Sequence, residues 1–137
     1  MLSLLFSIGV AYDGYRNKKR FTKSADTLRH WTATIAHIQL IVGFILYFKS
    51  PIISFFYSNY ELVSESWNTI FFAVVHFAIM LIGIVILTIA SAMAKRKPSD
   101  ELKFKTMLVW YSVSLILIVI AIPWPFSPLS ERPLIRY

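Results

Sequence analysis

Apolar residues gather in four stretches along the chain, and polar, mostly basic segments separate them. A helix rises about 1.5 Å per residue and the hydrocarbon core of a bilayer is about 30 Å thick, so a spanning helix needs about 20 residues. The pattern predicts an all-α, polytopic membrane protein: a four-helix transmembrane bundle forming one domain over residues 1–137. The predicted spans cover about residues 1–15, 30–48, 67–94 and 107–124, the last closing on "PWPF" at 123–126.

The first of these spans is short. Its apolar part, Met1 to Tyr12, covers only about 18 Å as a helix. A signal peptide is disfavoured because no basic segment precedes the apolar run. Three interpretations stay open: a partner completes the outer half of this helix, the bilayer is locally thinned, or the true start lies upstream of Met1.

Turn-forming residues support the remaining boundaries. Pro51 cannot continue a helix and disfavours helical geometry at Ser50, so the second span ends there. Pro98 breaks the third span, after which Ser99 or Asp100 can cap the lead-in "ELKFKTM" to the fourth. Because this connection is short, the third and fourth spans are expected to be antiparallel neighbours.

The distribution of basic residues predicts the orientation. Of the 14 Lys and Arg residues, 11 fall in the segments 16–29 and 95–106, Arg29 among them. Loops rich in Lys and Arg stay in the cytoplasm, so both loops are expected inside and both termini outside. The other loop holds Lys49, Glu61 and Glu65, and the tail holds Glu131, Arg132 and Arg136.

Composition agrees with a membrane protein. The chain is 57% hydrophobic and only 15% charged, whereas soluble domains average about 25% charged residues. The net charge of +7 is explained by loops that face anionic head groups, so no nucleic-acid partner is expected. The absence of cysteine excludes disulfides, thiolate-ligated clusters and covalently attached haem.

Two histidines interrupt apolar segments that are predicted to lie in lipid. Counted from the ends of their spans, His37 is about 10 Å deep and His76 about 13 Å deep from opposite sides, so they could face one another near the middle. One interpretation makes them the two axial ligands of a haem b iron. The other makes them neutral imidazoles that hydrogen-bond across the bundle to Ser112, Ser114, Thr34 or a backbone carbonyl.

Other polar positions suggest packing more than chemistry. Gln39 lies roughly 200° around the helix from His37 and is expected to bond to another span or subunit. His30 is expected to be a solvated interface residue. The stretches 30–48, 67–94 and 107–124 contain no Asp or Glu, and no catalytic motif is present.

Three segments carry a resemblance to a known type of protein. They are "AHIQLIVGFILYFKSP", "VVHFAIMLIGIVILTIASAMAKRK" and "DELKFKTMLVWYSVSLILIVIAIPW". The chain resembles small four-span bacterial inner-membrane proteins of the cytochrome b-like type, which are related to the SirB and CopD families. The resemblance implies a bacterial cytoplasmic (inner) membrane, and it implies His37 and His76 as the positions to test for haem b. It also implies a complete first helix with its own histidine, which this chain lacks.

Two functions follow from these observations. The first is a haem b-binding membrane subunit for electron transfer. The second is a non-catalytic accessory or structural subunit of a larger respiratory or transport complex. In the second, His37, Gln39 and His76 make polar contacts between helices or subunits, and the partners are other membrane proteins.

Overall fold

The computed structural model of the protein describes residues 1–63 and 66–124, and these residues form helices and no strand. The all-α prediction is therefore confirmed. In chain order the helices are α1 (Leu2–Arg16), α2 (Lys23–Lys49), α3 (Pro51–Ser58), α4 (Tyr60–Val63), α5 (Trp67–Ile70), the π-helix η1 (Phe71–Val75), α6 (His76–Arg96) and α7 (Asp100–Ala121).

Three helical segments are long and apolar enough to cross a membrane. They are α2, the continuous 30-residue run of α5, η1 and α6, and the 22-residue α7. These segments characterise a membrane protein. α1, with 15 residues, forms where the short first span was predicted, but it lies below the usual spanning length.

The helix ends follow the turn signals in the sequence. α2 ends at Lys49, and Pro51 occupies the first turn of α3, where a missing N–H costs nothing. The Ser99 hydroxyl accepts a hydrogen bond of 3.3 Å from the Leu102 amide and caps α7. Both predicted boundaries are confirmed.

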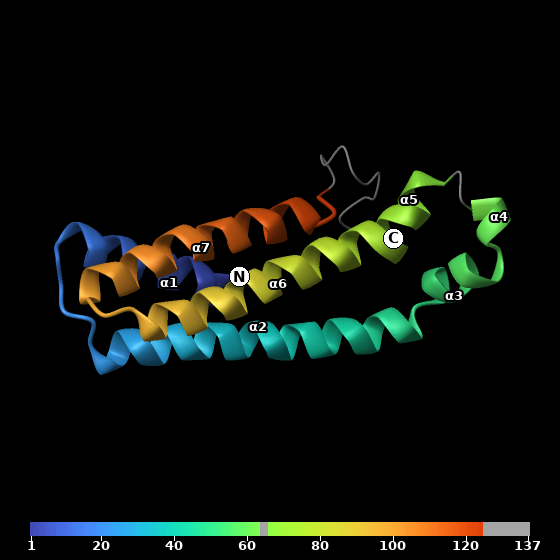
Figure 1. The fold of residues 1–137 in the computed structure, drawn as a ribbon. Coiled ribbons are helices and arrows are strands. Elements are labelled where there is room, and N and C mark those ends of the chain that lie inside the picture. Colours follow the sequence, from blue (N-terminus) through green and yellow to red (C-terminus); the bar gives the residue numbers. More distant parts are fainter. Residues whose placement is uncertain (64–65, 125–137) are drawn as a thin grey trace.

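α6 and α7 pack against each other as antiparallel neighbours along most of their length, as predicted (Figure 1). Their shared core includes Leu87 and Ala90 of α6 and Met107 and Tyr111 of α7, which are almost fully buried. Small residues on α6 let the two backbones approach closely. α2 lies along the other side of α6.

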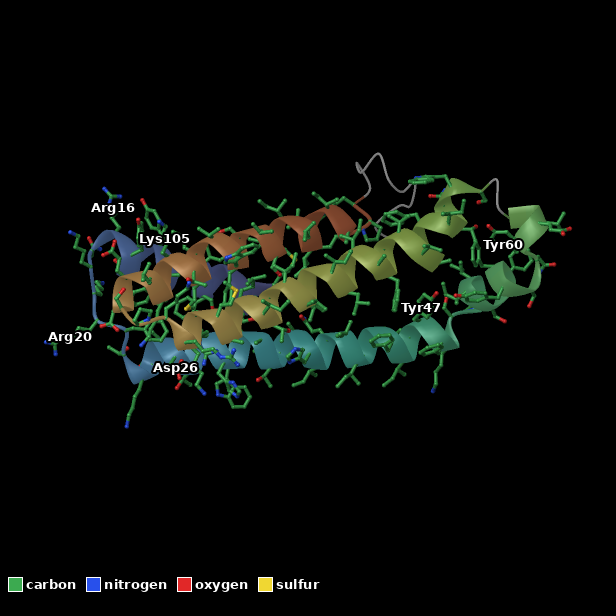
Figure 2. All side chains as sticks on the ribbon, viewed as in Figure 1. Arg16, Arg20, Asp26, Tyr47, Tyr60 and Lys105 are labelled. Carbon is green, nitrogen blue, oxygen red and sulfur yellow. The ribbon has the colours of Figure 1, made fainter. Side chains whose placement is uncertain are left out.

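The end of the bundle that holds the α1–α2 and α6–α7 connections is called the basic end. Arg16, Arg20 and Lys105 lie there, as Figure 2 shows. The opposite end carries α3, where Ile53 and Phe56 pack against Ala73. Glu65, the tail charges Glu131, Arg132 and Arg136, and residues 125 and 126 of the predicted interface segment lie outside the described residues.

α1 packs between α2 and α7 over the half of the bundle nearest the basic end. Gly14 of α1 meets the ring of Phe104, which in turn lies edge-on to Phe21 with ring centroids 5.0 Å apart. Met1 lies beside Ala36 and Gln39, midway along α2. The far half of α2, α6 and α7 therefore has no α1 beside it.

Candidate functional site

The His37 imidazole is used in a contact between α2 and α6. Its Nε2 lies 2.8 Å from the hydroxyl oxygen of Thr88. The Thr88 hydroxyl donates its own proton to the carbonyl oxygen of Ile84, at 2.8 Å. Because that proton is already used, His37 Nε2 must carry the hydrogen and donate it to Thr88. This hydrogen bond ties the imidazole to the neighbouring helix.

The His76 imidazole points to a different neighbour. Its Nδ1 lies 2.7 Å from the carbonyl oxygen of Ala121 at the end of α7. A carbonyl only accepts, so Nδ1 carries the hydrogen and donates it to Ala121. His76 directly follows the π-helix η1, at which the Tyr47 hydroxyl donates to the Ala73 carbonyl oxygen at 2.8 Å.

The structure does not bring the two imidazoles together. His37 is level with Thr88, and Thr88 lies twelve residues from His76 on the same helix, about 18 Å along its axis. The predicted depth of His76 in the membrane is counted from Trp67, and this count places His76 near the level of His37. The α5–η1–α6 run is 30 residues long, or about 45 Å, which exceeds the 30 Å core. As placed here, the pair does not fit the two faces of one haem iron.

Two serines and a threonine named from the sequence lie on these helices. The Ser114 hydroxyl is fully buried and donates to the Gly83 carbonyl oxygen at 2.7 Å, which joins α7 to α6. Ser112 is half-buried and makes no hydrogen bond to another described residue. Thr34 donates to the His30 carbonyl within α2, and His30 itself is exposed beside Trp31.

A buried polar network near the basic end was not predicted. Arg29, which sequence analysis grouped with the basic loop, lies inside α2 and is only 4% exposed. Its Nη1 donates to the carbonyl and hydroxyl oxygens of Ser91, at 2.9 and 2.6 Å. Its Nε donates to Asp26 at 2.9 Å, and the Tyr111 hydroxyl donates to the Arg29 carbonyl at 3.2 Å. One guanidinium therefore joins α2 to α6.

The expectation for Arg29 fails because α2 starts at Lys23 and carries Arg29 into the interface with α6. One local feature of the sequence could have indicated that Arg29 is buried. Asp26 and Arg29 are three residues apart and so neighbours on one helix face. The small residues around Ser91 leave room for a long side chain to enter. Alongside, the Ser7 and Thr32 hydroxyl oxygens lie 2.6 Å apart and join α1 to α2.

A groove follows the seam between α2 and α6, beyond the N-terminus of α1. It consists of two adjoining cavities that share Gln39, Met80 and Ile84. Met1 and Leu4 of α1 close one end of the groove, and Tyr47 and His76 lie at the other. We call this feature the α2–α6 groove; its principal residues are Gln39, Gly43, Phe44, His76, Phe77 and Met80.

The Gln39 amide is the unusual group in the α2–α6 groove. It can form four hydrogen bonds, yet no other described residue bonds to it. Four residues further along α2, a side chain added at Gly43 would meet no atom within 4 Å. A polar group and an open backbone position thus share one surface of the α2–α6 groove.

No group of three or more His, Cys, Asp or Glu residues that could hold a metal ion occurs within residues 1–63 and 66–124. Comparison with protein families, curated proteins and solved structures finds no match to this chain. The function proposed below is therefore based on the contacts within the structure.

Proposed function

We propose that this protein is a non-catalytic accessory subunit of a larger membrane complex, and that a transmembrane helix of another subunit packs into the α2–α6 groove. The observation that carries the proposal is the Gln39 amide, which has no partner among the described residues. Leaving such a group unpaired in an apolar environment costs about 1–3 kcal/mol. A neighbouring helix with a hydrogen-bonding side chain removes that cost; lipid tails offer no such group.

The groove also continues an interface that is already present. α1 packs between α2 and α7 near the basic end, and Met1 and Leu4 line one end of the groove. A helix in the groove would pack beside α2 and α6. Gly43 would let its backbone approach α2 closely, as glycine does at many membrane helix interfaces.

The remaining intramembrane polar groups support a structural role. His37, His76, Ser114 and Arg29 each bond to a neighbouring helix. Such contacts fix how the helices sit beside one another. A rigid scaffold of this kind suits a subunit that offers a preformed surface to a partner.

In this proposal the protein lies in a bacterial cytoplasmic membrane that α2, the α5–η1–α6 run and α7 cross, with the C-terminus outside. The basic end faces the cytoplasm by the positive-inside rule. α1 lies along the half of the bundle nearest the cytoplasm, and the partner helix packs in the α2–α6 groove. The resemblance to cytochrome b-like inner-membrane proteins agrees with this membrane.

Native mass spectrometry of the protein, extracted from its own membrane in mild detergent, tests the proposal. We expect a hetero-oligomer of fixed stoichiometry. Gly43→Leu should release the protein as a free chain because it fills the groove. Gly9→Leu is the matched control, since Gly9 also has open space around it but lies on α1, outside the groove. A free chain or a homo-oligomer in the unmodified protein would overturn the proposal.

Haem b binding for electron transfer is a second candidate, and one observation favours it. Histidines that bind metals usually donate their other ring N–H to a carbonyl or carboxylate, and His76 does so to Ala121. The Nε2 of His76 is then available in the α2–α6 groove. His37 lies at the level of Thr88, about 18 Å along α6 from His76, and is too distant to be the second ligand. A reduced-minus-oxidised b-type spectrum that disappears in His76→Ala would support this candidate. No such spectrum after haem supplementation would exclude it.

A further inference from the structure

Three lysines from three different helices converge on one open pocket at the basic end. Lys23 begins α2, Lys95 lies in the last turn of α6, and Lys103 lies in the first turn of α7. The pocket has a volume of about 250 Å³, and Phe21, Thr22 and Asp26 complete its lining. We call it the lysine pocket. Side chains so far apart in sequence meet here only because the three helices end at the same level.

The lysine pocket has a surplus of positive charge. Neither Lys23 nor Lys95 forms an ion pair with another described residue. Lys103 lies 3.9 Å from Asp100 and 5.3 Å from the centre of the Phe21 ring. The acidic lining residue, Asp26, already accepts a hydrogen bond from Arg29 at 2.9 Å. The N-terminus of α2, with its partial positive charge, opens onto the same space.

Such a pocket fits a phosphate group, because ammonium groups from several sides can each contact one of its oxygens. The position of the lysine pocket indicates which kind of molecule supplies the phosphate. The pocket lies where the apolar helices α2, α6 and α7 reach the basic end. The positive-inside rule puts this end at the cytoplasmic surface of the membrane, where phospholipids hold their phosphates. Basic pockets between transmembrane helices bind anionic lipid head groups in this way.

We propose that the lysine pocket binds the phosphate of an anionic phospholipid, with Lys23, Lys95 and Lys103 as its three cationic contacts. The bound lipid would hold the ends of α2, α6 and α7 together. Its glycerol and acyl chains would lie along the apolar outer faces of these helices. The proposal depends on the basic end lying at a membrane surface and is independent of the accessory role.

Native mass spectrometry of the intact protein from mixed vesicles of phosphatidylglycerol and phosphatidylcholine tests the proposal. We expect one phosphatidylglycerol to be retained in preference to phosphatidylcholine. The triple variant Lys23→Gln, Lys95→Gln, Lys103→Gln should weaken this retention by more than tenfold, because it removes all three cationic contacts to the phosphate. The matched control, Lys18→Gln, Arg96→Gln, Lys105→Gln, removes the same charge outside the pocket and should retain the lipid.

Three results would overturn the proposal. Equal losses in both triple variants would show that diffuse surface charge, and not the pocket, holds the lipid. Displacement of the lipid by millimolar inorganic phosphate would identify a site for free phosphate instead. No preference for phosphatidylglycerol in the unmodified protein would show that the pocket takes no anionic lipid. Circular dichroism of each variant, matching the unmodified spectrum, confirms that the helices remain folded.

Discussion

The Nε2 of His37 donates to the hydroxyl of Thr88 across the interface between α2 and α6, at 2.8 Å. That single hydrogen bond fixes the tautomer of the imidazole, because the Thr88 proton is committed to the Ile84 carbonyl. It also sets the relative height of the two helices, and with it the separation of His37 from His76. An imidazole in an apolar segment is here explained by helix packing.

The His37–Thr88 contact should be measurable as a coupling energy. In a double-mutant cycle of His37→Leu and Thr88→Val, we expect a coupling of about 0.6 kcal/mol, the average for polar contacts between membrane helices, and at most about 1.7 kcal/mol. Unfolding free energies in mild detergent supply the measurement. Thr27→Val is the control, since Thr27 is exposed on α2, and it should show no coupling with His37→Leu. A coupling near zero for the His37–Thr88 pair would contradict the assigned contact.

Gly14 should tolerate no side chain. A Cβ at this position would lie 2.5 Å from Cζ of Phe104, and that ring is 3% exposed and held against Phe21. Gly14→Ala should therefore destabilise the protein by about 1–3 kcal/mol through overpacking. Gly9→Ala, in open space on the same helix, should be neutral or stabilising by up to about 1 kcal/mol. Thermal unfolding of the two variants checks this; equal midpoints would show that α1 does not dock as described.

Arg29 should contribute far more to stability than the other arginines of the basic end. Arg29→Met removes its bonds to Ser91 and Asp26 and should cost about 1.5–3 kcal/mol, the range for hydrogen bonds to charged groups. Arg29→Lys should recover only part of this, because an ammonium cannot reproduce the planar set of donors. Arg20→Met, at an exposed position, should change stability by less than about 0.5 kcal/mol. Chemical denaturation distinguishes these variants, and equal effects of Arg29→Met and Arg20→Met would refute the network.

Much of the fold was predictable because it depends on residues that are close together in the sequence. The break at Ser50–Pro51 and the cap at Ser99 depend on residues next to each other, and both appear in the structure. The all-helical architecture follows from the length of the apolar segments. These features need no knowledge of which helix packs against which.

The positions of the polar groups could not be predicted in the same way. Whether Arg29 faces solvent or Ser91 depends on the rotation of α2 against α6, which no local pattern specifies. The level of His76 depends on how far the α5–η1–α6 run extends, and here it exceeds the thickness used to count depth. Gln39 is predicted to bond to another span or subunit, but the groove around it depends on how α1, α2 and α6 pack together.

The most direct test of the account places a photo-cross-linking amino acid in the α2–α6 groove of the protein in its own membrane. We expect position Met80, which lines the groove, to form one protein adduct with a partner transmembrane helix, and Gln39→Leu to reduce that adduct. Position Ile82, 52% exposed on the same helix, should cross-link only to lipid. Lipid adducts alone at both positions, or an adduct at Met80 with a second copy of this chain, would contradict the account.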